Sequence, residues 1–387
     1  MTYTGIDEAE AVRLLSIIVA TPSVNPAFRG PGEPDGWFGE ARLAAELARW
    51  LEAAGIPAEL DEALPGRPNV IGRVRGTGNG PRILWEGHTD TVQVTGMAAP
   101  FEPQVRAGRL YGRGAVDDGA SIVAFLLAAR ALAADPPRAD VDVLVAADEE
   151  FTFAGIDHHM AQDAAYDFGI AGEPTGLRVV SACKGTVRWI VELHGRPAHT
   201  SKPHEGLSAI DAARRLLSDY DAEMARRTGM HPLLGPSTLT CTGFEAGEGA
   251  NTVPSRARLR FDYRYLPGER GIAVYEDFAR IAATLPERFP GIGVVVEPPF
   301  CDSLAQDVPA DHPVVRLMGA VCAGRGIAAE PLGVPFGSDS TKMVERGVPT
   351  IVFGPGSIDQ AHALDEHVAV AEVVEAARML VDFARSA

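Results

Sequence analysis

Apolar residues recur at helical spacing over residues 7–20 and 38–54, and this spacing predicts two amphipathic helices near the N-terminus. Short runs rich in apolar and β-branched residues predict strands at 69–75, 82–87, 141–147 and 167–171. A further helix is expected at 119–134, between the second and third of these strands. Because strands alternate with helices, the first part of the chain is expected to form an α/β sheet covered on both faces.

The pattern changes after about residue 180. Along residues 253–264, apolar side chains alternate with charged ones, as in a strand that buries one face. The expected elements are strands at 187–194, 237–243, 253–264 and 292–297 and helices at 206–227 and 271–285. Their β-α-β-β-α-β order predicts a ferredoxin-like unit, in which the helices cover one face of the sheet only.

The α/β character then resumes, with a helix expected at 312–325, a strand at 349–353 and a closing helix at 368–385. A chain of 387 residues is also too long for one ordinary domain. The simplest interpretation is a larger domain made of residues 1–179 and 298–387, interrupted by a smaller inserted domain at 180–297.

The amino-acid composition limits the classes of protein and of partner that need to be considered. A hydrophobic content of 46% and a charged content of 22% are those of a soluble globular protein. The formal net charge of −17 argues against nucleic acid as a partner, and no apolar run is long enough to predict a membrane span. The N-terminal residues lack an export signal and the cysteines lack C-x-x-C spacing, so we expect reduced thiols and a cytoplasmic protein.

Five polar stations stand beside apolar runs or glycine-rich turns, where ligands of an open α/β sheet are expected. They are Gly-His88-Thr-Asp90, Gly-Arg-Gly-Ala-Val-Asp117-Asp118, Asp-Glu149-Glu150, Gly-Glu173-Pro-Thr and Gly354-Pro-Gly-Ser-Ile-Asp-Gln-Ala-His362-Ala-Leu-Asp-Glu366. Two histidines with three or four carboxylates suit zinc, cobalt or manganese. A further carboxylate could serve as a general base. Together these residues are typical of a two-metal hydrolase.

The order of these stations along the chain and their amino-acid sequences resemble those of a family of metallo-amidohydrolases and peptidases. That family includes acetylornithine deacetylase, succinyl-diaminopimelate desuccinylase, aminoacylase and glutamate carboxypeptidase. The resemblance runs from about Leu14 to Val370, and the phrase Gly354–Glu366 is most similar to the acetylornithine deacetylase branch. It implies a zinc-peptidase-like catalytic domain, with a mixed sheet between helices, and an inserted ferredoxin-like lid domain that mediates dimerisation.

The resemblance also implies a ligand set for two divalent ions per chain, zinc first, with cobalt or manganese as alternatives. Since five ligands serve two ions, one must be shared. By resemblance Asp117 bridges: His88, Asp117 and Glu173 would hold one ion, and Asp117, Glu150 and His362 the other.

Two further carboxylates near the ligands have expected roles. Asp90 would accept the second imidazole N–H of His88 and so fix its tautomer. Glu149 is expected to be the base that takes a proton from water and passes it to the leaving amine. A solvated acidic run is the alternative for Glu149 and Glu150, but the other stations in order argue against it.

One departure from the family pattern follows the bridging aspartate. Relatives usually carry Met-Lys-Gly or Asp-Lys-Gly there, whereas this chain reads Asp117-Asp118-Gly119-Ala120. The lysine is either replaced by Gly119 or deleted.

Residues expected to touch substrate lie mostly in the inserted domain. His199 resembles a histidine that polarises the scissile carbonyl, in many relatives within the site of the neighbouring subunit, which implies a homodimer. Asn251 and Arg264 resemble positions that contact the carbonyl and the substrate α-carboxylate; a solvated basic face is the alternative for Arg264. The turn at Gly337 and Ser338 could contact a carboxylate or only cap a helix.

The leading hypothesis is hydrolysis of the amide bond of a small N-acyl amino acid, acetylornithine or a close analogue. A dipeptidase or carboxypeptidase and a desuccinylase are alternatives within the same class. A non-catalytic binding protein on the same fold is an alternative of another class, and it predicts a broken ligand set.

Overall fold

The chain divides into two compact units in the computed structural model, which describes residues 3–162 and 165–387. Unit 1 contains the described residues up to Ser181 together with 308–332 and 338–387, and unit 2 contains 182–307 and 333–337. The insertion expected from the sequence ended at 297. Unit 2 continues to Asp307 because β15 (Cys301–Ser303) pairs with a strand of its sheet.

The central sheet of unit 1 is mixed. Over the described residues its strand order is β1-β2-β6-β3-β7-β18-β8. Strands β6, β3, β7 and β18 run parallel to one another, and β2 and β8 pair antiparallel with β6 and β18. The edge strand β1 pairs antiparallel with β2. The bounds are β1 Ala58–Leu64, β2 Arg67–Val74, β3 Arg82–His88, β6 Asp140–Ala146, β7 Phe168–Ala171, β8 Val180–Cys183 and β18 Thr350–Val352. This confirms the predicted α/β class with a mixed sheet between helices.

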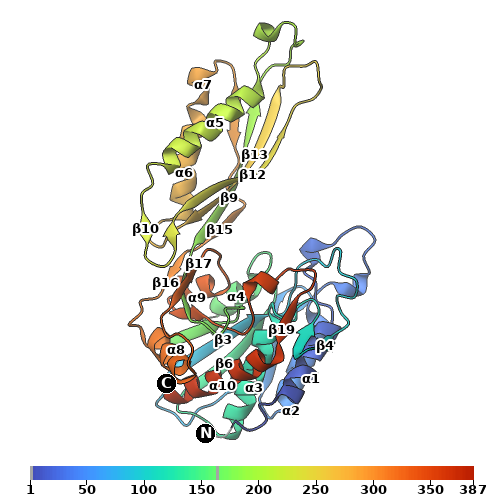
Figure 1. The fold of residues 1–387 in the computed structure, drawn as a ribbon, viewed down its shortest axis with the longest axis vertical. Coiled ribbons are helices and arrows are strands. Elements are labelled where there is room, and N and C mark those ends of the chain that lie inside the picture. The colour runs from blue at the N-terminus through green and yellow to red at the C-terminus, as the bar shows by residue number, and fades with distance from the viewer. Residues whose placement is uncertain (1–2, 163–164) are drawn as a thin grey trace. The chain divides into compact units, whose positions relative to one another are not determined.

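Helices cover both faces of this sheet. One face carries α1 (Glu8–Ala20), α2 (Ala41–Ala53), α3 (Gly119–Ala134), α8 (Pro313–Gly324) and α10 (Val370–Ser386), and Figure 1 shows α3 and α10 along it. The other face carries α4 (Ala154–Met160) and α9 (Ser340–Glu345). None of the helices in the described part of the chain is both long enough and apolar enough to span a bilayer.

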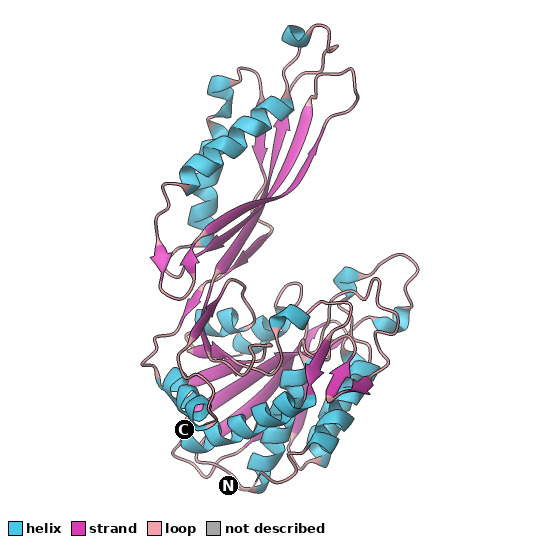
Figure 2. Cartoon of the chain, viewed as in Figure 1, coloured by secondary structure: helices cyan, strands magenta, loops and turns pink. Residues whose placement is uncertain are grey.

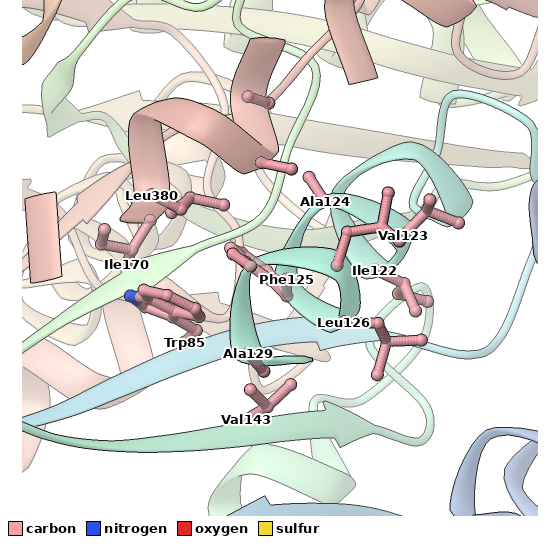
Figure 3. Close-up of a cluster of buried hydrophobic side chains, with 14 of the residues drawn as sticks. Trp85, Ile122, Val123, Ala124, Phe125, Leu126, Ala129, Val143, Ile170 and Leu380 are labelled. Atoms are coloured by element: carbon pink, nitrogen blue, oxygen red, sulfur yellow. The ribbon is translucent and has the colours of Figure 1, made fainter. Parts of the chain in front are cut away.

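Helix α3 is apolar on nearly all sides because it lies between the sheet and the outer helices α1 and α10. Trp85 of β3 stacks on Phe125 of α3 with ring centroids 5.8 Å apart, and Figure 3 shows Ile170 and Leu380 closing the same cluster. This packing fixes α3, and with it the loop that precedes Gly119.

The parallel strands end at one edge of the sheet. In register, His88 at the end of β3 lies opposite Ala146 at the end of β6, and Glu86 lies opposite Ala171 at the end of β7. The stations that follow these strands are therefore gathered in space, as expected for the carboxyl edge of an open α/β sheet.

Unit 2 is an antiparallel sheet with the order β12-β13-β9-β14, and Figure 2 shows its two long helices on one face. Trp189, Tyr220, Phe261 and Phe278 form the aromatic centre of its core. The elements are β9 Gly185–His194, α5 Ala209–Met224, β12 Thr238–Ala246, β13 Arg256–Tyr265, α6 Gly271–Ala283 and β14 Gly293–Val296. This is the predicted ferredoxin-like order.

The sequence analysis missed several short elements. A small sheet, β19-β5-β4, joins Gln104–Arg106 (β4), Arg109–Tyr111 (β5) and His367–Ala369 (β19). Strands of three residues carry no usable periodicity. The other short α-helix and strands are α7 Leu285–Arg288, β10 Met230–His231, β11 Gly235–Pro236, β16 Gln306–Asp307 and β17 Leu332–Val334, and short 3-10 helices lie at Pro26–Phe28, Asp35–Trp37, Pro203–Glu205 and Ile358–Gln360.

Candidate metal centre

Two groups of metal-competent side chains lie in unit 1, and in each group the candidate ligand atoms are within 4.8 Å of one another. Asp117 stands between them: its Oδ1 is 3.0 Å from Nε2 of His88, and its Oδ2 is 3.2 Å from Nε2 of His362. The first group is His88, Glu149 and Glu173, and the second is Asp117, Glu150 and His362. The structure thus brings the five expected ligands and Glu149 together, with Glu149 close to His88.

Most of the candidate site residues lie at or just beyond the end of a regular element. His88 is the last residue of β3, Glu173 follows β7 and Glu149 follows β6. Asp117 lies just before α3, and His362 sits in the loop after β18 with a left-handed φ of 59°. The sheet and α3 therefore supply rigid supports for side chains that are far apart in sequence.

The donor set fits divalent cations. Burial raises the pKa of Glu149 and of Glu173 well above its ordinary value, and the charges of nearby carboxylates add to both shifts. Hydrogen bonds to Asp117 and Glu150 raise the pKa of His362 to about 10. These carboxylates repel one another, and a divalent cation would offset that repulsion. Together with the two imidazoles they provide the oxygen and nitrogen donors that zinc and similar ions prefer.

Asp90 differs in part from its expected role. Nδ1 of His88 is 3.0 Å from the main-chain oxygen of Asp90 but 3.6 Å from its carboxylate. The carboxylate instead accepts hydrogen bonds from Asn25 Nδ2 at 2.7 Å and from the main-chain N–H groups of Glu149 and Glu150 at 3.0 and 3.1 Å. Asp90 therefore orients the imidazole through its main chain and the glutamate turn through its side chain.

A buried polar network that the sequence analysis missed supports the same turn. Asn25 also donates to Asp148 at 2.8 Å, and Arg67 donates to Asp148 at 2.8 Å and to Glu40 at 2.7 Å. Asp148 has a left-handed φ of 70°, which starts the turn that carries both glutamates. The Asp-Glu-Glu sequence pointed to this turn, but nothing in the sequence pointed to Arg67 or Glu40.

Gly119, which lies in the segment that departs from the family pattern, is closely packed. A Cβ at Gly119 would lie 2.3 Å from the main-chain oxygen of Gly114, so no side chain fits there without a main-chain shift. The preceding Asp118 is buried, and burial raises its pKa to about 7. The Asp117–Asp118 peptide bond is cis.

The expected substrate residues of unit 2 have other partners within that unit. His199 and Asn251 are exposed; the ring of His199 lies 2.8 Å from the Ser201 hydroxyl, and the main-chain oxygen of Asn251 accepts from Thr200 N at 3.0 Å. Arg264 donates to Asp262 at 2.7 Å, so its guanidinium is already paired. Gly337 also belongs to this unit.

Ser338 belongs to unit 1 and is buried. Its hydroxyl lies 2.9 Å from that of Ser340, the first residue of α9. These contacts are those of a residue that shapes the start of a helix.

Comparison with known proteins identifies relatives over almost the whole chain. The profile of a family described as Peptidase family M20/M25/M40 matches residues 84–386. Acetylornithine deacetylases from Vibrio atlanticus and Salmonella arizonae are each 28% identical to the chain. The first alignment covers 90% of this chain and 91% of the relative, and the second covers 92% of each.

Solved structures show the same fold. A tripeptidase from Staphylococcus aureus superposes with a TM-score of 0.81 at 19% identity, covering 98% of both chains. An aminopeptidase from Bacillus cereus gives 0.83 at 20% identity, covering 98% of this chain and 99% of that one. A dinuclear metal-binding peptidase from Bacillus subtilis gives 0.70 at 16% identity, covering 98% of both.

Proposed function

This chain belongs to peptidase family M20/M25/M40 and is a metal-dependent hydrolase, and we propose that it cleaves the amide bond of N-acyl amino acids. The family and the enzyme class confirm the resemblance stated from the five stations. The observation that carries the proposal is Asp117, placed between His88 and His362 with the carboxylate of Glu149 close by. The curated deacetylase relatives support an acyl group on the nitrogen of the substrate.

We assign His88, Asp117 and Glu173 to one metal ion and Asp117, Glu150 and His362 to a second. Zinc is the first choice and cobalt or manganese the alternatives, because all three accept carboxylate and imidazole donors. When bound, two such ions would polarise the substrate carbonyl and lower the pKa of the attacking water. An intact set of this kind is not expected in a binding protein that has lost catalysis.

Glu149 is the proposed general base. Its carboxylate is buried beside His88 and Glu173, and its main chain is held by Asp90 at 3.0 Å. In the reaction, the Glu149 carboxylate takes a proton from the attacking water and delivers it to the amide nitrogen. The water oxygen bonds to the carbonyl carbon, the C–N bond breaks, and a carboxylic acid and an amine leave.

The substrate contacts and the assembly are also part of the proposal. His199 would donate to the carbonyl oxygen, a contact of a kind that is typically worth about 3 kcal/mol in the transition state. Asn251, Arg264, Gly337 and Ser338 would contact the rest of the substrate, and Arg264 would exchange Asp262 for a substrate carboxylate. A homodimer and a cytoplasmic location complete the proposal.

A substrate panel tests this function. The enzyme with zinc added should hydrolyse N-acetyl amino acids faster than N-succinyl amino acids or free dipeptides. EDTA should abolish the activity, and zinc or cobalt should restore it. Faster cleavage of dipeptides would contradict deacylation, and full activity in EDTA would contradict a metal hydrolase.

A further inference from the structure

Glu366 is buried close to the metal centre without belonging to either ligand group, and its carboxylate accepts four hydrogen bonds. Oε2 accepts from Nη1 of Arg113 at 2.6 Å and from Gly114 N at 3.1 Å. Oε1 accepts from Val116 N at 3.0 Å and from Asp117 N at 3.2 Å. One side chain therefore holds three main-chain N–H groups of the loop that ends at Asp117.

Arg113 extends this contact to a third segment. The guanidinium of Arg113 is buried and also donates to the main-chain oxygen of Gln93 at 3.1 Å. The main-chain N–H of Arg113 donates to the main-chain oxygen of Pro100 at 2.8 Å. The main chain of Glu366 in turn accepts from Gly112 N at 3.1 Å. The buried pair thus joins residues 93–100, 112–117 and 362–366.

Two of these segments carry proposed ligands. Asp117 contacts both histidines of the site, and His362 precedes Glu366 by four residues. A displacement of the Asp117 main chain by a few tenths of an ångström would move both of its carboxylate oxygens. Such a shift would weaken metal binding, because metal ions tolerate only a narrow range of ligand distances and angles.

We propose that Glu366 is a positioning residue that fixes the main chain of Asp117, so that its carboxylate can meet both metal ions. The inference rests on the proposed two-metal site. It assigns to Glu366 an effect on metal affinity, transmitted through Asp117, and no contact with the substrate. A merely structural residue would change stability but would leave the affinity of the folded protein for metal unaltered.

The test compares E366Q with a matched control, D142N. Gln keeps the size of the side chain but removes its charge and replaces one acceptor oxygen with a donor. Asp142 is also a buried carboxylate, bound by Arg82 at 2.7 Å and by the Tyr166 hydroxyl at 3.1 Å. Arg82 begins β3, whereas His88 ends it, so this pair lies away from the ligands.

Zinc and cobalt dissociation constants are measured by competition with a chelator, on proteins shown to be folded by circular dichroism. We expect E366Q to bind metal roughly 10–100-fold more weakly than wild type and D142N to stay within about threefold. The visible spectrum of bound cobalt should change in E366Q only. Unchanged affinity in folded E366Q, or an equal loss in D142N, would overturn the proposal.

Hydrogen exchange provides a second measurement. In metal-free wild type, peptides covering residues 112–118 should be protected, because Glu366 already binds their N–H groups. In metal-free E366Q the same peptides should exchange faster than in wild type. If E366Q does not fold, E366D is used instead, because it shortens the side chain by one methylene and keeps its charge. E366D should likewise bind metal more weakly and exchange faster in this segment. Fast exchange of this segment in metal-free wild type contradicts the inference. Failure of wild type to hold two ions would instead contradict the proposed function.

Discussion

Glu149 and Glu150 are adjacent in sequence, yet their side chains have different partners. Both main-chain N–H groups donate to the carboxylate of Asp90, which fixes the turn on which they lie. Oε1 of Glu150 is then 3.1 Å from Nε2 of His362, while Glu149 lies with His88 and Glu173. At the scale of single residues, this turn makes a division between a ligand and a base geometrically possible.

The division predicts opposite outcomes for two substitutions. Glu149→Ala should retain two metal ions and its substrate affinity, while kcat falls by roughly 10²–10⁴-fold or more because the base is lost. Glu150→Ala should lose metal because a ligand is lost. Steady-state kinetics and atomic absorption of the dialysed proteins measure both effects. Metal loss in Glu149→Ala, with retention in Glu150→Ala, would show that the two roles are reversed.

Resemblance could predict the candidate ligands because each lies in a short motif of its own. The residues that position them could not be predicted in this way. Asn25, Arg67 and Glu366 act through hydrogen bonds to segments that lie far away in the sequence. Such partners depend on the tertiary packing of loops, which no local pattern encodes.

At the scale of elements, the long strands and helices followed from periodicity, and helix α3 begins and ends at the predicted residues. The short strands β4, β5 and β19 did not, although β19 carries the chain onward from Glu366. Their pairing depends on which loops are brought together by the larger sheet. The sequence therefore predicted where the ligand-bearing strands end better than it predicted how the connecting loops are fixed.

Two ion pairs that share Arg67 connect three segments of unit 1. Arg67 begins β2, Glu40 immediately precedes α2, and Asp148 starts the glutamate turn after β6. Glu40 is fully buried, and burial raises the pKa of its carboxyl group although Arg67 opposes the shift. The two pairs therefore couple the position of helix α2 to that of the glutamate turn.

Arg67→Met should lower the free energy of unfolding by about 3–5 kcal/mol, because it leaves Glu40 buried without its partner. The double variant Arg67→Met/Glu40→Leu should recover much of that loss, since it removes the uncompensated carboxylate as well. Equilibrium unfolding in guanidinium chloride measures both variants. A double variant less stable than Arg67→Met would contradict this explanation.

At the scale of the whole molecule, unit 2 has a sheet edge through which two chains could associate. In the described sheet of unit 2, β12 pairs with β13 on one side only, so it is an edge strand. An exposed edge of this kind is usually covered, and association in a closed two-fold dimer is a common way to cover it. The unit also carries His199, whose ring is exposed and bonded within its own loop.

If His199 acts in the site of the partner, two inactive variants should complement each other when mixed. His199→Ala keeps its metal ligands and Glu149, whereas Glu149→Ala keeps His199. A mixed dimer then contains one intact composite site, and about half of the dimers in a random equal mixture are mixed. Activity should recover toward about a quarter of wild type, measured after subunit exchange is verified by mass spectrometry of tagged chains. If exchange is complete and no activity returns, His199 acts within its own chain or takes no part in catalysis.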